Sequence, residues 1–214
     1  MLTFGNTRSI IRVIFELNNI NKVFETFRTY LQSKGVVLTE EELLKIELAA
    51  VKKKFRKHQL LLQENSVWSY NAFVCDGCLR MYYIDDKGEH IMRFAFENWW
   101  IGDRESYNMG TPSKYNIEAL EETEVILWTK HNFTDLKETI PEFKKFMDLL
   151  VVNNQIASQT RIHSAIVLTA EERYAEFLKV YPGVSNRIPL HMIASYLGVS
   201  RETLSRIRNQ KYSK

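Results

Sequence analysis

Arginine and glutamate side chains gather on one short segment near the end of the chain. Residues 200–208 read SRETLSRIR, and the spacing of Arg201, Glu202 and Arg206 places them within about two turns of one helix. An arginine can donate two hydrogen bonds to O6 and N7 of a guanine, and a glutamate can accept one from N4 of a cytosine. These residue types at this spacing predict a helix that reads base edges in the major groove of double-stranded DNA.

Two short helices joined by a tight turn would hold these side chains in place. Pro189 suits a first helical turn, Gly198 allows the left-handed backbone that ends a helix, and Ser200 is a good N-cap for the next helix. The predicted core-facing residues recur at helical spacing: Leu190, Ile193, Ala194 and Leu197 in the first helix, Val199 at the turn, and Thr203, Leu204 and Ile207 in the second. This order predicts a helix-turn-helix.

The predicted DNA contacts lie at the start of the second helix and on its outer face. They are Ser200, Arg201, Glu202, Thr203, Ser205, Arg206 and Arg208. Ser200 is placed to bind a phosphate at the helix N-terminus, whereas the longer side chains reach bases. The alternative is a surface helix with ordinary charges. Proline, alanine, glycine-valine, serine and arginine-glutamate in this order favour DNA binding.

Positive charge is concentrated in the same part of the chain. Residues 184–214 contain six cations and a single carboxylate, Glu202, although the net charge of the whole chain is only +3. The cations are Arg187, Arg201, Arg206, Arg208, Lys211 and Lys214. A basic end on a near-neutral body is the electrostatic pattern of a DNA-binding module.

The composition predicts a cytoplasmic protein with well-formed cores. With 214 residues and 45% apolar content, the chain suffices for one large domain or two small ones. No run of about 18 apolar residues is present, so neither a transmembrane helix nor a membrane partner is expected. The apolar patch near the N-terminus is broken by Arg12 and has no small-residue cleavage site, so it is not predicted to be a signal peptide.

The first two-thirds of the chain changes from helical to strand-like patterns. Residues 20–59 are predicted to be helical, with Gly35 ending one helix and Thr39–Glu42 as the capping box of the next. The basic run Lys52–Lys57 indicates a solvated face leading into a strand rather than a nucleic-acid patch. Strands are predicted at Val67–Tyr70, Cys78–Ile84, His90–Phe96 and Val125–Trp128, with a hairpin turn at Asp85–Gly88. Such short strands indicate a small antiparallel barrel or jelly roll.

A long helix is predicted from Pro141 to about residue 166. Two stripes step along it by three and four: Phe146, Leu149, Asn153, Ile156, Thr160, His163 and Val167 in one, and Phe143, Met147, Leu150, Ala157 and Ser164 in the other. Two stripes predict a helix that packs on its own barrel with one face and on a partner helix with the other. A second capping box, Thr169–Glu172, begins the C-terminal segment.

The segment Ile193–Arg206 resembles the helix-turn-helix of the CRP/FNR family of bacterial transcription regulators, and the order of the preceding elements is similar to that family too. The resemblance implies an α+β fold with three parts: an N-terminal antiparallel β-roll, jelly-roll-like and with flanking helices, over residues 1–140; a long dimerisation helix over 141–168; and a C-terminal winged helix-turn-helix over 169–214. It also implies that Arg201, Glu202 and Arg206 read a TGTGA-like half-site.

The function implied by this resemblance is a sequence-specific transcription regulator and not an enzyme. Such a regulator binds an inverted-repeat operator as a homodimer, because two recognition helices enter successive major grooves about 34 Å apart. Its partners would be double-stranded DNA, a second copy of the chain and a small-molecule effector. RNA polymerase is a further candidate partner.

The same resemblance marks a candidate effector pocket in the β-roll. In the cyclic-nucleotide binders of the family a Gly-Glu pair holds the ribose, and an arginine some ten residues later neutralises the cyclic phosphate. The matching residues here are Trp100, Gly102, Asp103, Ser113 and Lys114. Aspartate replaces the glutamate and serine replaces the arginine, while Lys114 offers a point charge without the bidentate fork. We therefore expect no bound cofactor, no binding of cyclic AMP, and an effector of another kind.

Two alternatives remain at the level of sequence. Cys75 and Cys78 form a C-x-x-C that could act as a metal or redox sensor, although two cysteines supply half of a four-cysteine site and Gly77 favours a plain turn. In the other alternative the β-roll is only structural and DNA binding needs no ligand. The five histidines are scattered without an H-x-H pattern, so metal-dependent catalysis is not predicted.

Overall fold

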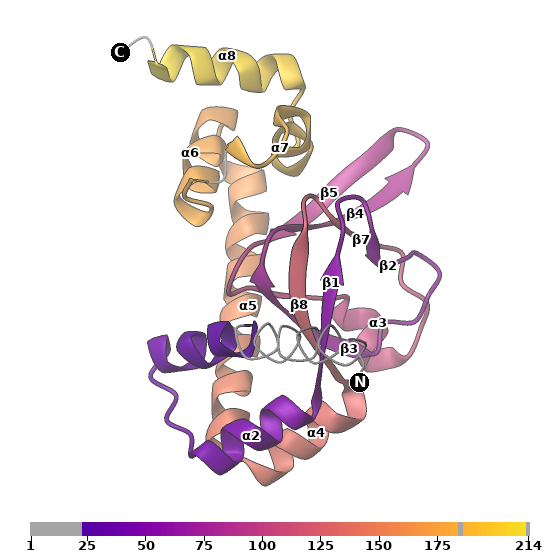
Figure 1. The fold of residues 1–214 in the computed structure, drawn as a ribbon. Coiled ribbons are helices and arrows are strands. Elements are labelled where there is room, and N and C mark those ends of the chain that lie inside the picture. The colour runs from indigo at the N-terminus through magenta and orange to yellow at the C-terminus, as the bar shows by residue number, and fades with distance from the viewer. Residues whose placement is uncertain (1–22, 184–185, 213–214) are drawn as a thin grey trace, which may run out of the picture.

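The computed structural model describes residues 23–183 and 186–212, and two four-stranded sheets form its centre (Figure 1). The first sheet has the strand order β1 (Ala50–Phe55), β8 (Thr123–Thr129), β3 (Tyr70–Asp76) and β6 (Trp100–Ile101). The second has the order β2 (Leu60–Leu62), β7 (Asn116–Ala119), β4 (Leu79–Asp85) and β5 (Gly88–Ala95). All neighbouring strands pair antiparallel, which confirms the predicted antiparallel β-roll.

The longer strands were predicted from the sequence, and the shorter ones were not. Strands β3, β4, β5 and β8 fall at or next to the predicted segments, and Asp85 pairs with Gly88 across the predicted hairpin turn. The prediction of a strand at Val67–Tyr70 is wrong, because Val67 forms only an isolated bridge and the strand begins at Tyr70. Strands β2, β6 and β7 have four residues or fewer, too few to show an alternating pattern.

The predicted helical segment ends earlier than expected. Residues 50–55 form β1, which pairs along its whole length with β8, so the helical prediction for 20–59 is wrong from Ala50 onward. Lys53 and Lys54 are exposed on this strand. The strand has a neighbour on one side only, and lysines are common on such edges because they resist pairing with another chain.

The two sheets enclose an apolar core. Val74 and Val125 of the first sheet and Leu79 and Ile117 of the second are completely buried in one cluster. Alternate residues of a strand point to opposite faces, so each sheet contributes one set of side chains to this core. Removal of this apolar surface from water stabilises the β-roll.

Helices cover the outer face of the first sheet. They are a helix over residues 23–33, α2 (Glu40–Leu48) and α4 (Lys130–Thr139). Phe27 packs edge-on against Phe73 with ring centroids 5.0 Å apart, and Trp128 donates from Nε1 to the carbonyl oxygen of Ile46 over 2.9 Å. The predicted capping box of α2 is present, since the side chains of Thr39 and Glu42 bond each other's backbone N–H. Aromatic packing thus fixes the helices on the sheet.

The long helix α5 (Pro141–Val167) runs beside the β-roll (Figure 1). It leads from the end with α2 and α4 to the end that carries α6 (Ala170–Val180), α7 (Leu190–Leu197) and α8 (Arg201–Tyr212). Phe143, Phe146 and Met147 are buried and anchor its first turns.

The expected wing of the winged helix-turn-helix is not found among the described residues. Residues 168–183 and 186–212 form helices and turns but no strand. The connection between α6 and α7 is short, and α8 continues to Tyr212, so the part of this segment that the structure describes leaves little chain for a hairpin.

Two expectations concern membranes and the chain ends. No helix in the described ranges is both long enough and apolar enough to cross a membrane. The N-terminal apolar patch, which was predicted not to be a signal peptide, lies within residues 1–22 and outside the described residues, as does Lys214.

A buried ion pair ties two strands of the second sheet together. Arg80 on β4 donates from Nε and Nη2 to one carboxylate oxygen of Glu118 on β7, over 3.0 and 2.6 Å, and both side chains are 7% exposed. Arg80 also bonds Glu89, and His58 Nδ1 lies 2.6 Å from the other oxygen of Glu118. Burial acts to raise the pKa of Glu118, but the bonds from Arg80 and His58 outweigh it and leave the pKa below its usual value. Glu118 is therefore ionised at neutral pH.

We expect Glu118→Gln to lower the free energy of unfolding by about 2 kcal/mol at neutral pH, because Arg80 would lose its charged partner in a buried position. Since the folded-state pKa of Glu118 is depressed below 4.5, its contribution is present above that pH and is lost as the pH falls through the folded pKa. Urea unfolding at several pH values from neutral to about pH 3 measures this difference. Glu122→Gln, which removes an exposed pair with Lys54, is the control and should cost less than about 1 kcal/mol. A difference that stayed constant with pH would contradict the assignment.

Candidate DNA interface and effector site

The turn between α7 and α8 has the geometry that the sequence predicted. Gly198 adopts the left-handed conformation, with φ 67° and ψ 37°, and ends α7. The side chain of Ser200 accepts a hydrogen bond from the backbone N–H of Thr203 over 3.1 Å and so caps α8. Pro189 is the N-cap residue of α7 and precedes its first turn instead of occupying it.

The inner faces of the two helices form one apolar cluster. Ile193, Ala194 and Leu197 of α7 are buried in it together with Leu204 and Ile207 of α8. The small side chain of Ala194 allows the helices to approach closely. The position of α8 is therefore fixed relative to α7 by packing as well as by the turn.

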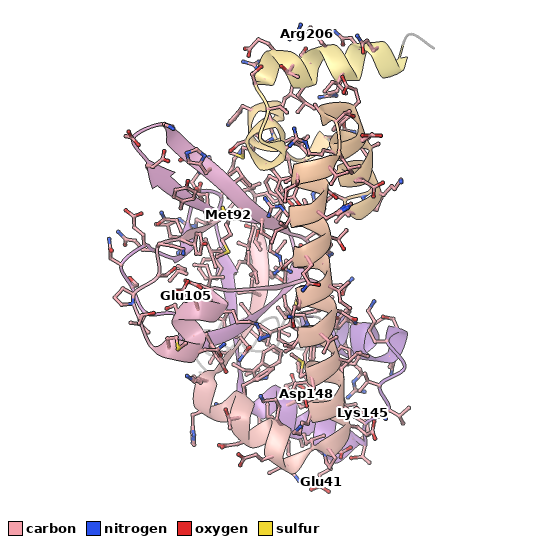
Figure 2. The ribbon with its side chains drawn as sticks, turned by 180° about the vertical axis from the view of Figure 1, so that it is seen from behind. Glu41, Met92, Glu105, Lys145, Asp148 and Arg206 are labelled. Carbon is pink, nitrogen blue, oxygen red and sulfur yellow. The ribbon has the colours of Figure 1, made fainter. Side chains whose placement is uncertain are left out.

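The outer face of α8 is open to solvent. Arg201, Glu202 and Arg206 are exposed, while Thr203, Ser205 and Arg208 are partly buried. Figure 2 shows Arg206 on the side of α8 that is turned away from the rest of the chain. Within the described part of the chain, neither Arg201 nor Arg206 forms an ion pair or a side-chain hydrogen bond. Hydrogen bonds from its own backbone N–H and from Ser200 lower the pKa of Glu202, so this side chain is an ionised acceptor.

Arg187 does not belong to this face, although the sequence counted it among the basic residues of the C-terminal segment. Its guanidinium bonds both carboxylate oxygens of Glu97, over 3.1 and 2.7 Å, and also bonds Glu121. Both carboxylates lie in the β-roll part of the chain. The charge of Arg187 is therefore neutralised at the contact between the helix-turn-helix and the β-roll.

In the candidate effector site, Asp103 caps α3 (Arg104–Met109). Its Oδ1 accepts hydrogen bonds from the backbone N–H groups of Glu105 and Ser106, over 3.0 and 3.3 Å, and the residue is 5% exposed. The helix N-terminus thus holds one oxygen of this carboxylate. A ribose would have to compete with these backbone donors for Asp103.

The cavity beside Asp103 is small. Trp100, Gly102 and Asp103 line a space of about 80 Å³ together with Trp68 and Tyr107. The indole of Trp68 packs directly on Gly102, where it would collide with any side chain. Pockets that hold small molecules usually measure about 300–1,000 Å³. Trp68 was not singled out from the sequence, because its place against Gly102 arises from residues far apart in the chain.

Ser113 and Lys114 do not line this cavity. Ser113 is 2% exposed, and its Oγ accepts a hydrogen bond from the backbone N–H of Tyr115 over 3.0 Å. Lys114 is exposed, and its Nζ lies 3.5 Å from a carboxylate oxygen of Glu105. The structure therefore brings together Trp100, Gly102 and Asp103 but leaves the two expected phosphate partners elsewhere.

Comparison with known proteins gives the same architecture. Residues 52–139 match the family model described as the cyclic nucleotide-binding domain. FixK2 from Bradyrhizobium japonicum is 21% identical, with 77% of this chain and 85% of that chain covered and a TM-score of 0.67. A Eubacterium rectale protein assigned as a transcriptional regulator of the CRP/FNR family is 18% identical, with 86% and 88% covered and a TM-score of 0.61. The catabolite activator protein of Thermus thermophilus is 18% identical, with 82% and 84% covered and a TM-score of 0.52. The comparison with curated proteins finds no match.

The chain has the CRP/FNR fold. Residues 52–139, which match the cyclic nucleotide-binding domain, supply most of the residues that line the cavity beside Asp103. The resemblance noted in the helix-turn-helix thus extends to the β-roll and the long helix, as the coverage of both chains shows.

Within this CRP/FNR fold, both cysteines are buried thiols beside the turn from β3 to β4. Burial raises the pKa of Cys75 to about 12 and also raises that of Cys78. Gly77 between them has φ 91°, a conformation that suits a turn. Metal binding and thiol exchange require the thiolate, which a raised pKa disfavours. No group of three or more histidine, cysteine or acidic side chains with the geometry of a metal site occurs in the described residues.

We expect cyclic AMP at millimolar concentration to leave the melting temperature unchanged. The two expected phosphate partners, Ser113 and Lys114, do not line the cavity, and Trp68 fills the space beside Gly102. A ligand at about 100 times its Kd would add roughly 2.7 kcal/mol of stability, which a thermal melt detects readily. A saturable rise in melting temperature with cyclic AMP would show that this site still binds the nucleotide.

Proposed function

We propose that this protein is a sequence-specific DNA-binding transcription regulator that binds an inverted-repeat operator as a homodimer and responds to a small molecule other than cyclic AMP. The observation that carries the proposal is the outer face of α8. Arg201, Glu202 and Arg206 stand exposed there, on a capped helix whose other face is fixed by packing. This is the arrangement that major-groove recognition requires.

The proposed contacts divide into two kinds. Arg201, Glu202 and Arg206 read base edges, while Ser200 and the flanking residues Thr203, Ser205 and Arg208 position α8 on the phosphate backbone. Lys and Arg contacts to phosphate provide affinity that falls steeply with salt and does not depend on sequence. The three-part division at residues 1–140, 141–168 and 169–214 assigns sensing, pairing and DNA binding to separate segments, with RNA polymerase as a further candidate partner.

An apolar face of α5 supports the homodimer. Large apolar residues along this helix are exposed in the single chain: Leu149, Val151, Val152, Ile156, Ile162, Ile166 and Val167, with exposures from 39% to 77%. Leu149, Val152 and Ile156 follow one another at spacings of three and four, which is the seam of two paired helices. Such a contiguous apolar face indicates a protein contact.

Selection of bound DNA from a random pool at physiological salt tests base reading. Wild type should enrich a TGTGA-like inverted repeat. Arg201→Ala or Arg206→Ala should cost about 1–3 kcal/mol and relax specificity at one position of each half-site, because one bidentate contact to a guanine is lost. Arg56→Ala removes an exposed cation far from α8 in the sequence and should leave the enriched sequence unchanged. An equal loss of affinity on all sequences would assign the two arginines to phosphate instead.

The dimer can be tested on α5 itself. Ile156→Asp should shift the protein to a monomer in analytical ultracentrifugation, because each dimer would bury two like charges in an apolar seam. Met109→Asp replaces a side chain that is 76% exposed on α3 and serves as the control, which should remain a dimer. A monomeric wild type, or a dimeric Ile156→Asp variant, would contradict this interface.

A ligand-independent regulator is the second candidate function. The small volume of the cavity beside Asp103 favours it, since a β-roll without a pocket could serve only for pairing and support. A screen of metabolites by thermal shift separates the two, because a gated regulator is stabilised by its effector.

A further inference from the structure

A second, larger cavity lies where the β-roll, α5 and the helix-turn-helix meet. Its volume is about 350 Å³, within the range of small-molecule pockets. Its walls come from β5 and the segment that follows it, from the second half of α5, and from α6 and α7. Figure 2 shows Met92, on β5, beside the part of α5 that lies toward the C-terminal helices. None of the five residues of the expected effector site lines this cavity, although Arg93 and Asn154 line both this cavity and the one beside Asp103.

Three arginines line the cavity, one from each of three elements: Arg93 of β5, Arg161 of α5 and Arg173 of α6. Arg161 donates from Nη1 to the carbonyl oxygen of Met92, and its guanidinium lies 4.1 Å from the ring centroid of Tyr196. Arg173 Nη1 reaches the carbonyl oxygen of Ala165 over 3.5 Å, but its Nε is buried without a hydrogen-bond partner.

Arg93 has the least compensated charge of the three. Its guanidinium lies 5.8 Å from the ring centroid of Trp99 and forms no hydrogen bond or ion pair with any side chain in the described residues. Burial lowers its pKa, and the like charges of Arg161 and Arg104 act in the same direction, against the hydroxyls of Tyr181 and Tyr196.

The walls of the cavity supply little negative charge. Glu176 is the carboxylate among the lining residues, and it pairs with Lys179 over 2.6 Å. A buried cation without a paired acceptor is costly, so an arrangement of this kind is stable only where something else compensates the charge. An anion inside the cavity would accept hydrogen bonds from guanidinium groups that have free donors.

Aromatic rings form another part of the wall. Trp99 and Tyr181 are stacked with centroids 5.3 Å apart and an interplanar angle of 24°. Phe177 and Tyr196 also line the cavity, with centroids 5.5 Å apart. Rings of this kind hold planar apolar groups by stacking and edge contacts.

We propose that this cavity binds a small organic anion that carries a planar aromatic ring, and that the bound anion clamps the helix-turn-helix onto the β-roll. The carboxylate, sulfonate or phosphate group meets Arg93, Arg161 and Arg173, and the ring lies against Trp99 and Tyr181. The inference deepens the proposed function and rests on it in one respect, because it makes this cavity the effector site of the regulator.

The cavity is compatible with a paired α5. Asn154, Ala157, Arg161 and Ser164 line the cavity and recur at spacings of three and four along one face of the helix. Leu149, Val152 and Ile156 follow the opposite face, since residue 156 is rotated by about 140° from residue 161. Thr160, one turn after Ile156, also lines the cavity, so a partner helix on the apolar face would border the cavity on that side.

The first test measures binding by the whole protein without DNA. The probe is 1-anilinonaphthalene-8-sulfonate, an aromatic anion whose fluorescence rises in apolar sites, and its uncharged counterpart N-phenyl-1-naphthylamine is the matched ligand. We expect saturable binding of one sulfonate per chain. Arg93→Met and Arg173→Gln should each bind it about tenfold more weakly, whereas the uncharged compound should bind wild type and both variants alike. Arg56→Gln, on the surface, should match wild type for both probes.

A second readout separates a binding role from a structural one. Without ligand, Arg93→Met should raise the melting temperature by about 2 °C or more, because a partly buried charge without a hydrogen-bonded partner is replaced by an apolar side chain of similar length. If Arg93 served to stabilise the fold, its replacement would lower the melting temperature instead. A fall in the melting temperature of Arg93→Met, or unchanged sulfonate binding in both variants, would overturn the proposal.

The outcome is distinct from that of the DNA selection. Loss of sulfonate binding in the variants together with an enriched operator for wild type supports both conclusions. If the protein binds the sulfonate but enriches no DNA sequence, with or without the probe, the regulator function is contradicted and the anion site is supported. If wild type enriches an operator but the variants bind the probe as wild type does, only the anion site is contradicted.

Discussion

The position of α8, the proposed DNA-reading helix, depends on one contact, the packing of the helix-turn-helix on the β-roll. Tyr181, which follows α6, is buried among Phe94, Phe96 and Trp99, with ring centroids 6.1, 5.7 and 5.3 Å away. A single apolar cluster therefore includes strands of the β-roll and all three C-terminal helices. Because packed interiors deform little, any movement of α8 relative to the β-roll has to break this cluster as a unit.

Polar bonds at the edge of that cluster fix its orientation. Ser195 on α7 bonds both the backbone N–H of Ile91 and the carbonyl oxygen of Glu89, each over 3.1 Å, and Arg187 joins Glu97 and Glu121. Separation of the helix-turn-helix from the β-roll would expose the aromatic rings to water and return the charges of Arg187, Glu97 and Glu121 to solvent. Docked and undocked arrangements would thus be two discrete states, and a ligand that touches both sides of the contact can shift the balance between them.

The cavity beside Asp103 combines the expected backbone path with side chains that differ from those of a cyclic-nucleotide site. The backbone turn at Gly102 and the capped helix α3 are present, so the chain follows the expected path. The side chains along that path are not those expected of a cyclic-nucleotide site. Trp68 occupies the space next to Gly102, and Ser113 accepts a hydrogen bond from the backbone N–H of Tyr115. The contact with the helix-turn-helix offers a larger cavity for an anion, about 350 Å³ against about 80 Å³, and three arginines line it.

The sequence by itself determined the local elements and the face of α8. Helical spacing, the Gly198 turn and the Ser200 cap act within a few residues, so the helix-turn-helix, the capping box at Thr39 and the hairpin at Asp85–Gly88 were predictable. The short strands and the early end of the helical segment at Ala50 were not, because pairing with β8 overrides local preference there. Only the tertiary structure decided that Trp68 lies against Gly102, that Arg187 faces the β-roll, and that Arg93, Arg161 and Arg173 meet around one cavity. These residues are far apart in the chain, and the physical reason is that burial and charge compensation depend on which surfaces pack together, which no spacing along the sequence specifies.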